Sequence, residues 1–195
     1  MKTKDNNIKM ETDRFVDERD GKVYKTVRIG SQIWMAENLN FATNEGSWSL
    51  DKNPYFAVDG TCCLYNDPKH IKKYDEKYGR LYDWNTAMKV APVGWHLPSQ
   101  EEWEELIRIL GGNKKAYDML IEGGASGFNA LNGGSRVVQT GEYGSFYYIG
   151  EQSTYWTSNE DTGEEDYSAI AVCECINFFW MDKTDAYSVR CTKNK

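Results

Sequence analysis

The chain has 195 residues and a formal net charge of −7, with 23 Lys and Arg against 30 Asp and Glu. This length suits a single domain, which would bury about 70% of the surface that its unfolded chain exposes. The acidic balance, without any long basic run, argues against binding to nucleic acid phosphates or to anionic membranes. No run of about 18 apolar residues occurs, so no transmembrane segment is predicted.

Residues 1–13 are polar, and we expect them to form an N-terminal tail before one domain over residues 14–195. The tail lacks the apolar core of a secretory signal. Either the chain is a processed or engineered form of an exported protein, or it is not exported by the usual route.

The first strands are predicted shortly after the tail. Residues 23–27 alternate apolar and polar side chains, and a Gly30-Ser31 turn leads to a second strand over residues 33–35, which together predict a β-hairpin. From Ala42 to Tyr78 the chain shows little periodicity and is rich in turn residues. Excursions of this length are typical of functional or poorly ordered loops.

Two helices are predicted in the middle of the chain. The first covers residues 84–91, with Asp83 as its N-cap. The second begins after Ser99, because Ser99 and Glu102 form the capping-box pattern, in which each side chain binds the other residue's backbone N–H. One face of this second helix carries apolar side chains at helical spacing, from Trp103, Leu106, Ile107 and Leu110.

The acidic residues of the second helix are explained by helix formation. Glu101 and Glu102 suit the positive end of the helix dipole, and Glu104 is spaced to pair with Arg108. His96, just before the helix, is interpreted as a framework residue that donates to a backbone carbonyl. The alternative is a general base, for which the sequence shows no nearby nucleophile or orienting acid.

The C-terminal half is rich in Gly and aromatic residues. Short aromatic strands are predicted within residues 122–161, and two further strands surround a turn at residues 182–185. A strand hairpin, two helices and then several short strands indicate an α+β fold, with the helices on one side of an antiparallel sheet.

The cysteines show no recognisable metal or redox motif. They are Cys62, Cys63, Cys173, Cys175 and Cys191. An odd number leaves at least one unpaired or paired between chains. No C-x-x-C pair is present and only two histidines accompany them, so no structural zinc site is expected. Cys173 and Cys175 lie two apart in a predicted strand and are interpreted as buried thiols on one face.

One acid-rich stretch, NEDTGEED at residues 159–166, has carboxylates of the kind that bind calcium. A solvated, turn-forming loop explains it more simply. No cofactor or metal is therefore predicted.

Five stretches occur in a characteristic order: TVRIGSQIWMAENLNF, YGRLYDW, VGWHLPSQEEWEEL, YWTS and YSVRC. Over about Val23 to Cys191 they resemble the Fibrobacter succinogenes major paralogous domain, a family of bacterial modules common in Bacteroidetes. The stretch HLPSQEEWEEL is also similar to the RLPTEAEWE helix of formylglycine-generating-enzyme-like proteins. The resemblance implies a C-type-lectin-like fold, with a small twisted antiparallel sheet, two helices, long irregular loops and neighbouring termini.

The resemblance also implies a location. Members of that family are mostly surface or secreted modules of uncertain role, so the cell surface or the exterior is expected. Members often have Cys-Pro before Gly-Trp-His, where this chain has Ala91-Pro92. If that cysteine pairs with the one in VRC, Cys191 has lost its partner. A virion component made in the cytoplasm is the alternative location.

The hypothesis for function is a non-catalytic binding module, not an enzyme, whose loops at residues 42–66 and 141–166 engage a protein or a glycan. The candidate contacts are aromatic, because such rings dominate interaction hot spots and stack on sugars: Tyr143, Phe146, Tyr147, Tyr148 and Trp180. About half of them are expected to fill the core instead, with FYYIG a candidate buried strand.

Two other functions remain open. One is a structural or decoration subunit of a surface complex or phage virion. The other is a formylglycine-generating-type oxidoreductase that uses Cys62 or Cys63. The sequence sets no oligomeric state.

Overall fold

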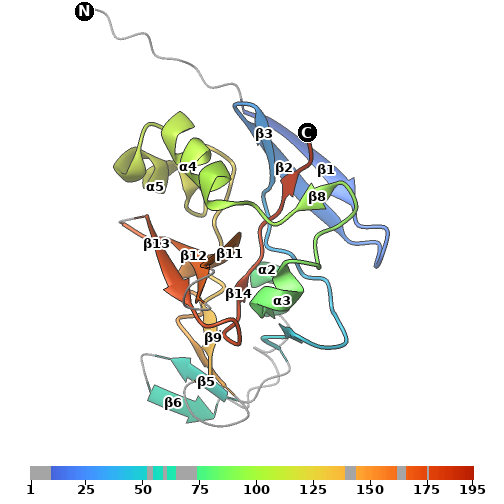
Figure 1. Ribbon diagram of the computed structural model, residues 1–195, viewed down its shortest axis with the longest axis vertical. Coiled ribbons are helices and arrows are strands. Elements are labelled where there is room, and N and C mark those ends of the chain that lie inside the picture. The colour runs from blue at the N-terminus through green and yellow to red at the C-terminus, as the bar shows by residue number, and fades with distance from the viewer. Residues whose placement is uncertain are drawn as a thin grey trace, which may run out of the picture.

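The structure is a computed structural model, and it describes residues 10–51, 55–58, 61–64, 74–138, 144–161, 166–174 and 176–195. These residues form three β-sheets and four helices, which confirms the α+β class (Figure 1). The sheets and helices are more numerous than the one small sheet and two helices that we expected. The helices are α2 (Tyr74–Tyr78), α3 (Trp84–Ala87), α4 (Gln100–Ile109) and α5 (Asn113–Leu120).

A five-stranded sheet contains the predicted hairpin. Its order is β1 (Glu11–Val16), β2 (Val23–Ile29), β3 (Gln32–Met35), β15 (Thr192–Lys193) and β8 (Trp95–His96). The hairpin is β2 and β3, joined through Gly30 at φ 61, a conformation that favours glycine. All of β1 pairs with β2, from Glu11 opposite Arg28 to Val16 opposite Val23, so the last three residues of the expected tail 1–13 belong to this sheet. In Figure 1 the C-terminus lies beside these first strands.

A six-stranded sheet forms the centre. Its order is β13 (Asn177–Met181), β12 (Asp166–Val172), β11 (Ser153–Asp161), β14 (Tyr187–Ser188), β7 (Leu81–Tyr82) and β4 (Ser47–Trp48). The two strands predicted around residues 182–185 are β13 and β14, but they do not pair with each other. β13 pairs with β12, whereas β14 lies between β11 and β7, where Tyr187 packs edge-on against Trp156 at 4.7 Å between ring centroids.

A four-stranded sheet consists of β6 (Thr61–Leu64), β5 (Tyr55–Val58), β10 (Ser145–Tyr147) and β9 (Ser135–Val137). β5 runs parallel to β10, with Phe56 opposite Phe146. The turn-rich region 42–78 is therefore not wholly irregular, since it contains β4, β5, β6 and α2. β4 pairs with the distant β7, and β5 pairs with the distant β10, which no local pattern signals. β5 also pairs with its neighbour β6, and the Asp59-Gly60 dipeptide between them in the sequence is a hairpin signal that our prediction did not use.

Helix α4 follows its sequence signals closely. The Ser99 hydroxyl accepts from the Glu102 N–H at 3.3 Å, and the Ser99 N–H donates to the Glu102 carboxylate at 3.0 Å. The four apolar side chains of its predicted face are all buried: Trp103, Leu106, Ile107 and Leu110. The expected ion pair is different, because Arg108 binds Glu105 at 2.7 Å.

The other helices depart more from expectation. Asp83 caps α3 by accepting from the Thr86 N–H at 2.8 Å, as predicted. The helix ends at Ala87 rather than residue 91, and the carbonyl of Val90 instead accepts from Arg19 at 2.8 Å. The short helix α5, which was not predicted, follows directly after Gly111 and Gly112.

The main apolar core lies where α4 and α5 cover the sheets. Trp34 and Trp103 contact each other at 4.8 Å between centroids, and Phe128 packs against both rings. Tyr155 completes this aromatic group from β11. All four side chains are fully buried, so the core joins strands of two sheets to one helix.

Arg190 is buried next to this aromatic group, with no exposed surface. Its guanidinium donates to three backbone carbonyls, of Met35 at 3.1 Å, Phe128 at 2.7 Å and Asn129 at 3.1 Å. It also donates twice to the Asn38 side-chain oxygen, at 2.5 and 3.2 Å. Burial lowers the pKa of Arg190 from its ordinary value. A buried charge needs such compensation, here supplied by dipoles and by the face of Phe128 at 4.7 Å.

Replacing this guanidinium by an amine should destabilise the domain. In Arg190→Lys the forked donor geometry is lost and several buried oxygens lose their partner, so we expect the free energy of unfolding to fall by about 3 kcal/mol. Denaturant titration measures this. Arg14→Lys, at an exposed position of β1, is the matched control and should change stability by less than about 0.5 kcal/mol. Equal stability of the two variants would contradict the assigned role.

Candidate functional site

The aromatic residues predicted to bind a partner do not form one surface. Phe146 is 1% exposed and packs with Leu50 and Leu81, so its assignment as a surface contact is wrong. Phe146 is buried because the face of β10 that carries it packs against this small apolar core. Tyr147 and Tyr148 lie together, with ring centroids 6.2 Å apart, and Tyr148 is half exposed.

The two remaining candidates are separate from this pair. Trp180 is half exposed on β13, which belongs to a different sheet from β10. Tyr143 lies outside the described residues, as do parts of both predicted binding loops, 42–66 and 141–166.

His96 was expected to donate to a backbone carbonyl, but its ring nitrogens contact two side chains instead, one of which is an acid that the sequence analysis did not foresee. Nε2 contacts both oxygens of Glu102 at 2.9 and 3.0 Å, and Nδ1 contacts the side-chain oxygen of Asn194 at 2.6 Å. Glu102 therefore both caps α4 and orients the imidazole. The contact links the start of α4 to the end of the chain.

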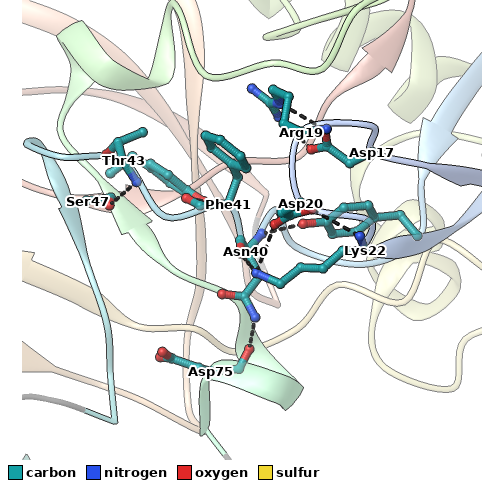
Figure 2. A network of polar contacts seen from close by, with 11 residues as sticks. Asp17, Arg19, Asp20, Lys22, Asn40, Phe41, Thr43, Ser47 and Asp75 are labelled. Atoms are coloured by element: carbon teal, nitrogen blue, oxygen red, sulfur yellow. Dashed lines mark hydrogen bonds and ion pairs between the residues drawn. The ribbon is translucent and has the colours of Figure 1, made fainter.

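A polar network joins the β1–β2 hairpin to α2, with Asn40 at its centre (Figure 2). The Asn40 N–H donates to the Tyr24 hydroxyl at 3.0 Å, and its side-chain amide donates to the carbonyl of Asp75 at 2.8 Å. Its own carbonyl accepts from the ammonium of Lys22. These bonds fix the chain between β3 and α2.

The hairpin turn is held by a second part of the same network. Arg19 binds the Asp17 carboxylate through two nitrogens, at 2.6 and 2.8 Å, and its guanidinium lies 3.9 Å from the centroid of Phe41 (Figure 2). Burial raises the pKa of Asp17, but the hydrogen bonds and the charge of Arg19 outweigh it, so the pKa is lowered overall. The Asp17 carboxylate is nearly inaccessible, with 1% exposure.

Asp75 extends the network to the segment before β5. Its carboxylate accepts from the Ser49 hydroxyl at 2.5 Å and from the Leu50 N–H at 2.7 Å. Burial and the negative charge of Asp75 raise the pKa of the neighbouring Asp51. Asp75, at the start of α2, thus anchors the segment around Ser49 and Leu50, which the sequence analysis had predicted to be part of a loop.

Beside this network lies a polar cleft of about 490 Å³. Three segments form it: the end of the hairpin with the chain after β3, helix α2, and the chain after α5. Its lining is Lys22, Val23, Tyr24, Glu37, Asn38, Asn40, Glu76, Lys77, Glu122, Asn129 and Leu131. We refer to this hollow as the polar cleft.

The rim of the polar cleft is charged and its lining includes fixed amides. Lys77 and Glu122 pair across it at 3.2 Å, and this hydrogen bond raises the pKa of Lys77. Asn38 is 3% exposed and donates to the carbonyl of Tyr78 at 2.9 Å, while its oxygen is held by Arg190. Asn129 adopts φ 58, which asparagine tolerates, and its carbonyl is bound by the same guanidinium.

Sequence reasoning missed the polar cleft. One of the stretches that carried the resemblance lines it, since Asn38 and Asn40 come from AENLN. A second stretch, YSVRC, supplies Arg190, which is buried and holds the Asn38 side chain. The polar residues within these framework stretches were the one sequence feature that could have indicated the cleft. Their contacts span more than 150 positions, which no local pattern encodes.

Comparison with known proteins places the chain in a family. The Fibrobacter succinogenes major domain matches residues 27–193. The chain belongs to this family. No curated protein and no solved structure matches it.

The matched range covers the network and the polar cleft, apart from the residues up to Tyr24 that come from the hairpin turn and the start of β2. Ala91, where the resemblance implies a cysteine in other members, packs against the same apolar cluster that contains Cys191. Cys191 is fully buried, and burial raises the pKa of its thiol to about 12.

The other cysteines divide into three cases. Cys173 is exposed, so its assignment as a buried thiol is wrong, because β12 ends at Val172 and the chain bends there. Cys175 lies outside the described residues. Cys62 and Cys63 belong to β6, but their side chains lie outside the described part, so an oxidoreductase role for them stays a hypothesis.

Two features are missing from the described ranges, a metal-binding cluster and a membrane-spanning helix. No group of three or more His, Cys, Asp or Glu there is arranged to hold a metal ion, and residues 162–165 of the acid-rich stretch fall outside those ranges. In this part of the family domain, none of the helices has the length and apolar character needed to span a bilayer.

The Asp17–Arg19 pair should contribute to stability in a pH-dependent way. Because the folded pKa of Asp17 is lowered, its contribution is present above about pH 4, the pKa of an unfolded Asp, and is lost as the pH falls through the lower folded value. We expect Asp17→Asn to cost about 1–2 kcal/mol at neutral pH and progressively less in acid. Denaturant titrations at several pH values measure the difference, with exposed Asp13→Asn as the control. A cost that does not change with pH would contradict the charge-based account.

The two described cysteines should differ in reactivity. Cys191 is fully buried with a raised pKa, so we expect no alkylation by iodoacetamide at about pH 8 until the domain unfolds. Cys173 is exposed and should be modified in the folded state. Mass spectrometry of peptides after timed labelling distinguishes them. Labelling of Cys191 at the rate of Cys173 would show that the C-terminal strand opens readily.

Proposed function

We propose that this member of the Fibrobacter succinogenes major domain family is a non-catalytic recognition module, and that the polar cleft binds a protein or glycan partner. The observation that carries the proposal is the pairing of fixed amides with charged groups of both signs around one hollow. Amide, carboxylate and ammonium groups together supply donors and acceptors, as the hydroxyls of a glycan or an extended peptide backbone require.

Preorganisation supports the same proposal. Asn38 is held by Arg190 and by the carbonyl of Tyr78, so the base of the cleft is already ordered before a partner binds. Immobilising a free side chain costs about 0.5–1.5 kcal/mol, and a fixed one avoids that cost.

We further propose a C-type-lectin-like architecture, with the module at the cell surface or secreted. The meeting of the first strands with the C-terminal strand in one sheet supports this architecture. Scaffolds of that kind carry binding function on their loops. Tyr148, with Tyr147 beside it, is then a candidate for a second contact, together with Tyr143 and Trp180.

The second candidate is a structural or decoration subunit of a surface complex or a phage virion, made in the cytoplasm in the latter case. The observation that favours it is the exposed edge strand β13, with half-exposed Trp180. This function would need contacts between chains rather than a ligand in the polar cleft.

Screens of variants test the first candidate. The intact chain is screened on a glycan array and in a pull-down from surface extracts, and we expect at least one screen to give a ligand. Binding of that ligand should fall at least about tenfold in the double variant Glu76→Ala with Glu122→Ala, because both carboxylates lie at the rim of the polar cleft. Glu18→Ala removes an exposed carboxylate elsewhere and should leave binding unchanged. If binding depends on Tyr148 but not on the rim carboxylates, the binding site lies beside β10 and not in the polar cleft. If neither screen gives a ligand, the result counts against a recognition function.

A further inference from the structure

The end of the β1–β2 hairpin carries an apolar patch beside the polar cleft. Val16 and Val23 are directly opposite each other in this antiparallel pair, so their side chains lie on the same face, about 5 Å apart. They are 56% and 54% exposed. Val23 also belongs to the lining of the polar cleft, so the patch adjoins the cleft. We refer to these two side chains as the valine pair.

Packing within the domain does not account for the valine pair. The next pair along the hairpin, Phe15 opposite Tyr24, faces the other side of the sheet and supplies the contacts with the core. Phe15 stacks on Tyr24 at 5.4 Å and on Trp95 at 4.5 Å between ring centroids. The valine pair faces away from these rings, and exposed apolar side chains rimmed by polar residues are one of the marks of a binding groove.

Both ammonium groups in the lining of the polar cleft are held by partners within the chain. Lys22 donates to the carbonyl of Asn40 and pairs with Asp20 at 3.2 Å (Figure 2). Lys77 pairs with Glu122 at 3.2 Å. An anionic partner would have to compete with these contacts, so the lining does not favour one.

Glu76 offers the opposite charge to a partner. It is exposed on α2, it lines the polar cleft, and among the residues that the structure describes no cation pairs with it. The whole chain carries −7, so its field also attracts a cation. Arg14 and Lys25 follow the valine pair along the hairpin, so a basic side chain of the partner fits at Glu76 and not beyond the valine pair.

These features together select the chemistry of the partner. The hydroxyls of a sugar would lose water against the valine methyl groups without gaining a hydrogen bond, whereas an aliphatic side chain buries there favourably. An acidic partner would be repelled, and so would a second copy of this chain, because it carries the same −7. A polypeptide segment with one aliphatic and one basic side chain matches both the valine pair and Glu76.

We propose that the partner in the polar cleft is an extended segment of another protein, which places an aliphatic side chain on the valine pair and a Lys or Arg side chain at Glu76. The inference rests on the proposed recognition function and narrows its partner from protein or glycan to a basic peptide segment. Such a segment buries less than the roughly 1,600 Å² of a standard interface, so a dissociation constant in the micromolar range or above is expected.

Capped octapeptides test the proposal in NMR titrations of the intact, 15N-labelled chain. Each peptide carries one Leu and one Lys, at a varied spacing, in a background of Ala and Ser. We expect at least one spacing to bind and to shift the amide signals of Val23 and Glu76. At that spacing, a peptide with Ser in place of its Leu should bind at least about tenfold more weakly.

The valine pair is tested by the double variant Val16→Thr with Val23→Thr, which keeps the β-branched shape that suits a strand. It should weaken binding of the Leu peptide at least about fivefold and leave binding of the Ser peptide unchanged. Val93→Thr, at a position that is 98% exposed and outside the cleft lining, is the matched control and should change neither. The amide spectra of both variants show whether the fold is kept.

Charge reversal tests the contact at Glu76. Glu76→Lys should weaken binding of the peptide that carries Lys at least about tenfold and should restore binding of a peptide that carries Glu in its place. A loss of structure would not produce that restoration.

The outcomes separate this inference from the recognition function on which it rests. If a sugar binds in the polar cleft and none of the peptides does, the inference is overturned and recognition stands. Peptide binding that ignores the valine pair, or that charge reversal does not restore, overturns the inference as well. If neither peptides nor sugars bind, both the inference and the proposed function fail.

Discussion

The structure depends on one buried cation. Arg190 donates five hydrogen bonds to the Asn38 side chain and to carbonyls of β3 and of the chain after α5. No carboxylate is among these acceptors, so the guanidinium charge is balanced mainly by dipoles and by the faces of two aromatic rings, with a further contribution from the negative charge of Glu37. Such a charge tolerates little displacement of its acceptors, because each lost bond leaves a desolvated group behind. The segments that meet at Arg190 are therefore held to one arrangement.

That arrangement reaches the surface at the polar cleft. Asn38 and Asn129 are fixed by the core on one side and line the cleft on the other. Among the rim residues, Lys77 pairs with Glu122 and its ammonium lies 5.0 Å from the centroid of the Tyr78 ring. A rigid base below a charged rim is consistent with the recognition function that we propose for the polar cleft.

Sequence patterns predicted what depends on neighbours in the chain. The Ser99–Glu102 cap and the buried face of α4 were correct because their partners lie within a few residues. The β2–β3 hairpin was correct for the same reason. Phe146 was wrongly assigned to the surface, since its burial depends on Leu50 and Leu81, and Arg190 showed no local sign of its burial. The polar cleft combines three distant segments, so neither its place nor its lining was predictable.

One feature of the first sheet constrains how the chain is made. β15 lies between β3 and β8, and the Thr192 hydroxyl binds the carbonyl of Ile33 across 159 positions. During translation, β1, β2 and β3 emerge early, but their sheet lacks its fourth strand until residues 192–193 have left the ribosome. The core around Trp34 must wait equally long for Arg190. Native closure is therefore deferred until residues 190–193 have been synthesised, and until then a nascent chain holds exposed strand edges that chaperones would recognise.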